Sequence, residues 1–153
     1  MSFKPPKKKT WQIAGRLSHF KHVFPDDEAC LQLLAEYKWK SGFVCVKCGG
    51  TNYCKGKSPM SRRCTKCKTE ESATAHTVFH GCKFSLVKAF EIAFMVCNIA
   101  DISSYEMSRQ LDMRHMTCYN FQKKVHACVN GETQDPVFES LQLEINRRMN
   151  EWE

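Results

Sequence analysis

Apolar residues recur at helical spacing along most of this chain, with side chains at i, i+3, i+4 and i+7 forming continuous stripes. The pattern predicts helices at 27–38, 85–99, 103–111 and 115–129, and a last helix from Pro136 onwards. The helix at 85–99 is predicted to be buried from its apolar stripe, which consists of Leu86, Phe90, Ala93, Phe94 and Cys97. The inward face predicted for the helix at 115–129 is Cys118, Phe121, Val125 and Cys128.

Start signals support several of these boundaries. Asp26 and Asp135 are residues that commonly cap helix N-termini, and Pro136 suits a first helical position. Ser103 and Glu106 have the spacing of a capping box, in which each side chain bonds the other's backbone N–H. We therefore expect helices to begin directly after Asp26, Ser103 and Asp135.

Helical periodicity is lost between residues 43 and 75, where glycines and paired cysteines appear instead. Short strands near 51–54, 60–64 and 70–75 fit this segment best. The chain is thus predicted to be α+β. A small β unit would be preceded by one helix and followed by a three-helix bundle and a C-terminal helix.

Two C-x-x-C units lie in the β segment, Cys45 to Cys48 and Cys64 to Cys67, separated by fifteen residues. This spacing predicts one tetrahedral site with four thiolate ligands, which is a structural Zn²⁺ site because no position is left for water. Buried cysteines without metal, or a redox-active C-x-x-C pair, are the alternatives. Further side chains that could replace a ligand, but that lack a paired spacing, are Cys54, His76 and His80.

The chain is basic, with a net charge of +7. The excess of lysine and arginine lies in residues 1–24 and 43–84, whereas residues 25–42 and 130–153 are acidic overall. Such a distribution favours a polyanionic partner, although a basic surface can also serve only solubility. No segment has 18 consecutive apolar residues, which excludes a membrane span, and no signal peptide is recognisable. We expect a cytoplasmic protein with reduced thiols.

The helices at 103–111 and 115–129, joined by a short turn, have the proportions of a helix-turn-helix unit. The second helix would place its outward side chains against base edges and phosphates in a DNA major groove. A plain helical packing unit with a polar outer face is the alternative. The predicted DNA contacts are Lys55, Lys57, Arg62, Arg63 and Lys68 in the β segment, and Arg114, His115, Thr117, Tyr119, Asn120, Lys123 and Lys124 at the turn and second helix.

Four regions follow from these patterns. Residues 1–24 are predicted to be a disordered or loosely packed basic arm, 25–84 a helix with a zinc ribbon, 85–130 the helix-turn-helix bundle, and 131–153 a linker with an acidic amphipathic helix. The last helix could cover the bundle. It could instead form a dimer contact through Phe138, Leu141, Ile145 and Trp152.

The order of these pieces resembles the N-terminal region of bacterial insertion-sequence transposases with a zinc ribbon. The resemblance rests on Trp39-x-x-Gly42-x-x-Cys45-x-x-Cys48-Gly49, on Arg63-Cys64-x-x-Cys67, on residues 74–83, and on Ser104, Ser108, Leu111 and Thr117 in the helix pair. It covers about residues 20–129 and implies recognition of element-end DNA. Departures include Asp112 where glycine is usual and Cys82 where threonine is usual.

Transposases of this family continue into an RNase H-like catalytic domain, whereas this sequence ends at Glu153 after one helix. We therefore expect no enzymatic activity from this chain alone. The predicted function is zinc-dependent binding of double-stranded DNA in transposition, associated with the nucleoid, as a homodimer or with a catalytic subunit in trans. A stand-alone transcriptional regulator and a protein-interaction module are the alternatives.

Overall fold

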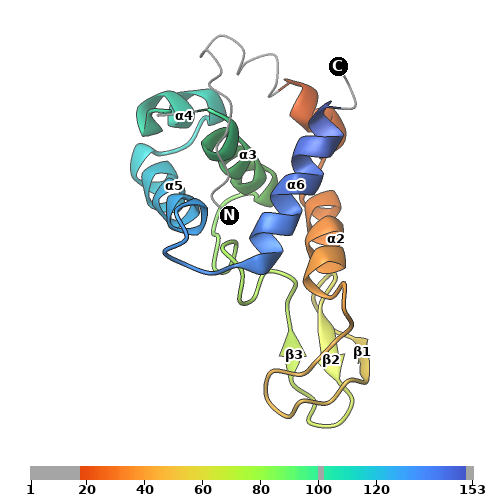
Figure 1. Ribbon diagram of the computed structural model, residues 1–153. Coiled ribbons are helices and arrows are strands. Elements are labelled where there is room, and N and C mark those ends of the chain that lie inside the picture. Colours follow the sequence, from red (N-terminus) through yellow and green to blue (C-terminus); the bar gives the residue numbers. More distant parts are fainter. Residues whose placement is uncertain (1–17, 100–101, 151–153) are drawn as a thin grey trace.

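The computed structural model describes residues 18–99 and 102–150. A helical segment at 18–23 is followed by α2 (Asp27–Lys38), β1 (Tyr53–Lys55), β2 (Arg62–Cys64), β3 (Glu70–Glu71), α3 (Leu86–Asn98), α4 (Ser104–Leu111), α5 (His115–Val129) and α6 (Pro136–Asn150). The helices form one body, from which the three strands project below α2 (Figure 1). This arrangement agrees with the predicted α+β class.

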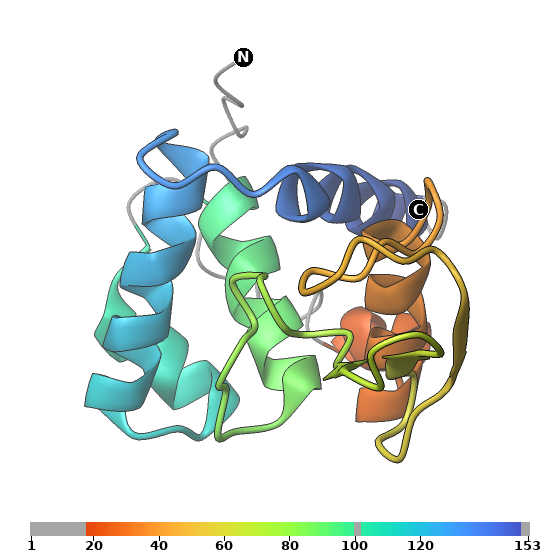
Figure 2. The same ribbon diagram turned by 90° about the horizontal axis from the view of Figure 1, so that it is seen from below.

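Helix α3 is the centre of the helical body. Its residues from Ala89 to Asn98 are all buried, because α2 and α6 cover one side and α5 covers another (Figure 2). The burial predicted for this helix is confirmed. No helix among the described residues is both long and apolar enough to cross a membrane.

Helix α6 packs within the chain instead of presenting an apolar face to a partner. Phe138, Leu141, Ile145 and Met149 are buried in the core that α6 shares with α2 and α3. The alternative in which this stripe forms a dimer contact is therefore wrong, and the alternative in which the last helix covers the other helices is correct. Trp152, the last residue of the predicted stripe, lies outside the described residues.

The end of the segment predicted as a loose arm is well packed. Phe20 and Phe24 are fully buried, with ring centroids 5.0 Å apart, and Phe24 also meets Phe90 of α3 edge-on at 5.6 Å. Loose packing is thus wrong for residues 18–24. Two aromatic rings one helical turn apart supply enough apolar surface to hold this short segment on the core. Residues 1–17, where disorder was predicted, lie outside the described residues.

The predicted helix starts are confirmed, with one difference in detail. Asp26 accepts a hydrogen bond from the N–H of Ala29, and Asp135 accepts one from the N–H of Phe138. Ser103 caps α4 through the N–H of Tyr105. Glu106 does not complete the capping box, because its carboxylate accepts hydrogen bonds from Arg109 and Gln110 one turn further along the helix.

The strands form an antiparallel sheet in the order β1-β2-β3, with Cys54 opposite Arg63 and Arg63 opposite Glu70. The third strand ends at Glu71, four residues earlier than predicted. Its continuation cannot pair with a strand, because the carbonyls of Ser72 and Ala75 accept hydrogen bonds from the Lys38 ammonium at 2.7 and 2.6 Å.

Residues 76–84 belong to the helical body and not to the ribbon. Phe79 is buried, and its ring centroid lies 4.9 Å from that of Phe90 and 6.0 Å from that of Phe121. The ribbon therefore ends near Ala75, ahead of the predicted boundary at residue 84.

Truncation of the α6 stripe should destabilise the chain. Ile145 is fully buried, so Ile145→Ala is expected to lower the free energy of unfolding by about 2–5 kcal/mol in a urea titration. Leu143→Ala is the matched control, because Leu143 on the same helix is 64% exposed and should change stability by less than about 0.5 kcal/mol. Equal effects of the two variants would contradict the packing of α6 described above.

A carboxylate at the contact of α6 with α2 should make stability fall in acid. Hydrogen bonds from Arg147, together with those from Arg148 and Tyr37, lower the pKa of Glu144 from 4.5 to about 2. Because the folded-state pKa is depressed, this contribution is present above pH 4.5 and is lost as pH falls towards 2. Thermal melts between pH 5 and 2 should show a shallower fall for Glu144→Gln than for the wild type. A parallel fall would show that Glu144 is not responsible.

Candidate metal centre and nucleic-acid surface

The two C-x-x-C units fold into equivalent turns. In the first, the N–H of Cys45 bonds the carbonyl of Gly50 at 2.8 Å, and the N–H of Gly49 bonds the carbonyl of Cys45 at 2.9 Å. In the second, the N–H of Cys64 bonds the carbonyl of Thr69 at 2.9 Å, and the N–H of Lys68 bonds the carbonyl of Cys64 at 3.0 Å. Each turn therefore presents its two sulfurs on the same side.

Each turn needs a left-handed residue four positions after its first cysteine. Gly49 has φ +74° and Lys68 has φ +65°. Glycine adopts this conformation without steric cost, whereas a lysine does so at a cost of about 1–2 kcal/mol. The two turns share one backbone shape although their sequences differ at this position.

The four sulfurs converge on one point. Sγ of Cys45 lies 3.5 Å from Sγ of Cys67, Sγ of Cys48 lies 3.5 Å from Sγ of Cys64, and all four lie within 4.8 Å of one another. A tetrahedral ion with metal–sulfur bonds of about 2.3 Å requires sulfurs about 3.8 Å apart. The residues present therefore fit one metal ion, and the predicted grouping of these four cysteines is confirmed.

Backbone and hydroxyl donors favour the thiolate form at the second turn. The side chain and backbone N–H of Thr69 lower the pKa of Cys67 to about 6, and the N–H of Cys67 lowers the pKa of Cys64. At Cys48 the N–H of Gly50 lowers the pKa, but the neighbouring sulfurs and desolvation outweigh it and raise the pKa to about 11. A bound cation would supply the charge that lets all four thiolates coexist.

Gly50 and Gly56 mark two places where the ribbon has no room for a side chain. A Cβ at Gly50 would lie 3.3 Å from Sγ of Cys48, in the space around the sulfurs. A Cβ at Gly56 would clash with the carboxylate of Glu70 and the hydroxyl of Ser61. The lack of a side chain at Gly50 leaves space for the cysteine sulfurs. At Gly56 it leaves space for the Glu70 carboxylate and the Ser61 hydroxyl.

The ribbon is fixed to α2 by a small second core and a buried ion pair. Trp39, Phe43 and Ala73 pack around Cys45 and Cys64 of the metal site. The ammonium of Lys38 lies 3.1 Å from the Glu71 carboxylate, and both side chains are only 8% exposed. Burial lowers the pKa of this lysine, and Glu71 opposes the shift. The sequence offered no signal for this pair, because its members are 33 residues apart and lie on elements of different type.

Most of the predicted basic contacts on the ribbon face solvent. Lys55, Lys57, Arg63 and Lys68 are exposed, and Arg63 lies opposite Glu70 in the sheet. Arg62 is half-buried, with its guanidinium 4.6 Å from the ring centroid of Trp39 and 4.2 Å from that of Tyr53. Its planar group is engaged in the ribbon's own packing, which the sequence did not predict.

Helices α4 and α5 are joined by a turn that requires a left-handed residue. Asp112 has φ +51°, and the N–H of Met113 returns to the carbonyl of Ser108 at 2.9 Å. Glycine is usual at such a helix end, and aspartate is among the few other residues that tolerate it. Ser108 is buried, and its hydroxyl donates to the carbonyl of Tyr105 at 2.8 Å.

The outward face predicted for α5 is largely exposed, and its inner face is buried as expected. The exposed side chains at the turn and on α5 are Arg114, Thr117, Tyr119, Asn120, Lys123 and Lys124. His115 is half-buried instead, because its Nε2 lies 2.8 Å from the hydroxyl of Ser104 and its ring stacks on Tyr105. The sequence did not single out Tyr105, because it lies on α4 and the DNA contacts of the helix pair were predicted at the turn and on α5.

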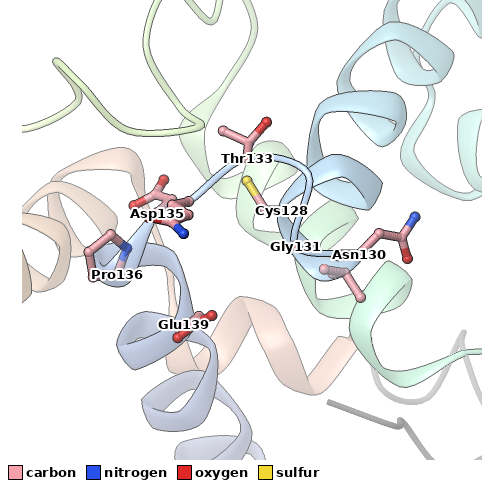
Figure 3. Close-up of a pocket in the computed structure, with 9 residues that line it drawn as sticks. Cys128, Asn130, Gly131, Thr133, Asp135, Pro136 and Glu139 are labelled. Carbon is pink, nitrogen blue, oxygen red and sulfur yellow. The ribbon is translucent and has the colours of Figure 1, made fainter. Parts of the chain in front are cut away.

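A hollow of about 420 Å³ lies where α5 passes into α6 (Figure 3). Asp135 lies at its edge, but its carboxylate oxygens already accept hydrogen bonds from the N–H groups of Val78 and Phe138. Burial raises the pKa of Cys128 to about 11, so this thiol is poorly reactive at neutral pH. The two hydrogen bonds of Asp135 tie the start of α6 to the segment at Val78.

Two thiolate-bearing turns that converge on one metal position beside a three-stranded antiparallel sheet define a zinc ribbon. Residues 25–70 match the family model described as a transposase zinc-ribbon domain, and this match identifies the ion that the four cysteines fit as zinc. The matched segment begins just before α2 and ends at the first residue of β3. It covers less than half of the chain. No curated protein and no solved structure gives a match.

Removal of one ligand should weaken metal binding. Cys64→Ser leaves three thiolates and a coordination position open to water, so it is expected to lose its zinc to a competing chelator that the wild type resists. Cys54→Ser is the control, since Cys54 lies on β1 between the two turns, is exposed and is not part of the cluster. Elemental analysis of the variants after dialysis against the chelator measures both. Resistance of Cys64→Ser equal to that of the wild type would contradict the assigned ligand set.

Proposed function

We propose that this chain is a zinc-dependent DNA-binding protein of the transposase type, which recognises duplex DNA at the ends of a mobile element. The observation that carries the proposal is the match of residues 25–70 to a transposase zinc ribbon. The adjoining α4–α5 pair supports it, with an exposed face rich in hydrogen-bonding and basic side chains. Nucleic acid is the partner that both parts have in common.

In this proposal the two parts of the molecule make different kinds of contact. Exposed lysines of the ribbon neutralise phosphates, which gives affinity without sequence preference. Helix α5 acts as the recognition helix of a helix-turn-helix unit and places Thr117 and Asn120 against base edges. The buried pair of Lys38 and Glu71 holds the ribbon on α2, so the two surfaces keep a constant relation.

The role proposed for the zinc is structural. Four protein thiolates close the coordination sphere, so the metal has no position at which to activate water or a phosphate. We therefore propose that the chain contributes DNA binding to transposition, and that cleavage and strand transfer require a catalytic partner. Genomic footprinting distinguishes this role from promoter regulation, because element termini would be occupied in one case and promoters in the other.

Neutralisation of the α5 lysines should weaken DNA binding in a salt-dependent way. Each phosphate contact contributes a slope of about −0.9 to log K against log salt, so Lys123→Gln with Lys124→Gln should make the slope shallower by up to about 1.8. The measurement is fluorescence anisotropy with a labelled duplex between 50 and 200 mM salt.

The control variant is Lys40→Gln, which removes the same charge from an exposed site that follows α2, at a distance from α5. It should leave the slope unchanged. No binding to any duplex, or binding that does not respond to salt, would remove the proposal. Retention of full affinity by the double variant would place the contact elsewhere.

A further inference from the structure

The starts of α4 and α5 carry an unusual group of exposed aromatic and apolar side chains. Tyr105 is 68% exposed, Met116 is 59% exposed and Tyr119 is 42% exposed. The ring of His115 links them, since its centroid lies 3.7 Å from that of Tyr105, nearly parallel at 7°, and 6.2 Å from that of Tyr119. We refer to Tyr105, His115 and Tyr119 as the aromatic platform.

The platform is held in place from below. Nε2 of His115 lies 2.8 Å from the Ser104 hydroxyl, and this contact fixes the imidazole on which the ring of Tyr105 stacks. Because Tyr105 is nevertheless mostly exposed, the other face of its ring is open to solvent. An aromatic ring that is both exposed and ordered can accept a further planar group with little loss of conformational freedom.

A hollow of about 280 Å³ adjoins the platform at Tyr119. One of its lining residues, Gln122, is only 8% exposed and donates from Nε2 to the carbonyl of Ile102 at 3.0 Å. This bond fixes the orientation of the amide, and Oε1 is itself buried without a hydrogen-bond donor among the described residues, so Gln122 forms a fixed part of the wall of the hollow. The hollow is lined by Ser104, Tyr119, Gln122, Lys123 and His126.

The charges around this surface favour an anionic ligand. Lys123 lies over the ring of Tyr119, with its ammonium 5.9 Å from the centroid, and Lys124 and Arg114 are exposed nearby in sequence. The acid next to the platform, Glu106, is compensated by Arg109 at 2.6 Å. An uncharged apolar partner would provide no counter-charge for these cations.

We propose that the aromatic platform binds an unpaired DNA base. The base stacks on the open face of Tyr105, and Lys123 contacts a neighbouring phosphate. Stacking rings beside basic side chains are the combination with which proteins hold single-stranded nucleic acid. This inference rests on the proposed DNA binding and adds a preference for DNA that is locally unpaired. It does not require α5 to read a duplex.

The test uses the full zinc-bound chain and three labelled duplexes of one sequence. The first is fully paired, the second carries one extra unpaired adenosine, and the third carries an abasic residue at the same place. The wild type should bind the unpaired adenosine at least about fivefold more tightly than the abasic bulge, which has the same backbone distortion without the base. Equal affinity for the two bulges would overturn the proposal.

Variants at Tyr105 separate stacking from folding, because this side chain is exposed and was not among the contacts proposed for duplex DNA. Tyr105→Ala should reduce the ratio between the two bulges to about one and leave the fully paired duplex unaffected, whereas Tyr105→Phe should retain the ratio. A ratio unchanged in Tyr105→Ala would overturn the role of the platform. Self-association that disappears in this variant, with no preference for the unpaired base, would show that the surface binds a second copy of the chain.

A preference for the unpaired base without measurable binding to the paired duplex would refute the proposed function alone. Binding to the paired duplex without a preference for the unpaired base would refute only this inference.

Discussion

Helix α3 is buried on every side over most of its length, and the need to cover it constrains the rest of the chain. Its residues from Ala89 to Asn98 are buried, and the elements that cover them come from both ends of the sequence. Helices α2 and α6, the short helix at 18–23 and the loop that carries Phe79 all contribute apolar side chains to the same core. The hydrophobic effect thus fixes the placement of segments that have little tendency to fold alone.

The ribbon depends on a different physical term. Its strands are two or three residues long, and its core contains few large side chains, so metal coordination has to supply most of its stability. The connection to α2 is equally specific. Trp39 packs against the metal ligands. The Lys38 ammonium pairs with the Glu71 carboxylate and donates hydrogen bonds to the carbonyls of Ser72 and Ala75. These contacts determine how the exposed lysines of the ribbon are oriented relative to the helices.

Local signals in the sequence predicted much of this structure. The helix ranges, the caps at Asp26 and Asp135 and the pairing of cysteines within each C-x-x-C unit depend on short spacings along the chain, and the two units together signalled the four-cysteine cluster. Interactions over long distances in sequence were not predictable in the same way. The burial of Phe20 and Phe24, the position of Phe79 in the helical core and the stacking of Arg62 between Trp39 and Tyr53 depend on which surfaces meet. The early end of β3 has the same origin, because a lysine on α2 takes the carbonyls that a strand would need.

Helix α2 contributes to two cores with different requirements. Leu33 and Leu34 belong to the helical core, whereas Ala35 and Trp39 at its end belong to the core around the cysteines. Mass action by free zinc stabilises only the state in which the second core is formed. A single melting temperature therefore does not describe this molecule, because the ribbon's melting depends on the zinc activity of the solution and that of the helices does not. In a compartment where zinc is buffered at low levels, the orientation of the ribbon becomes a readout of metal supply, while the helical body persists.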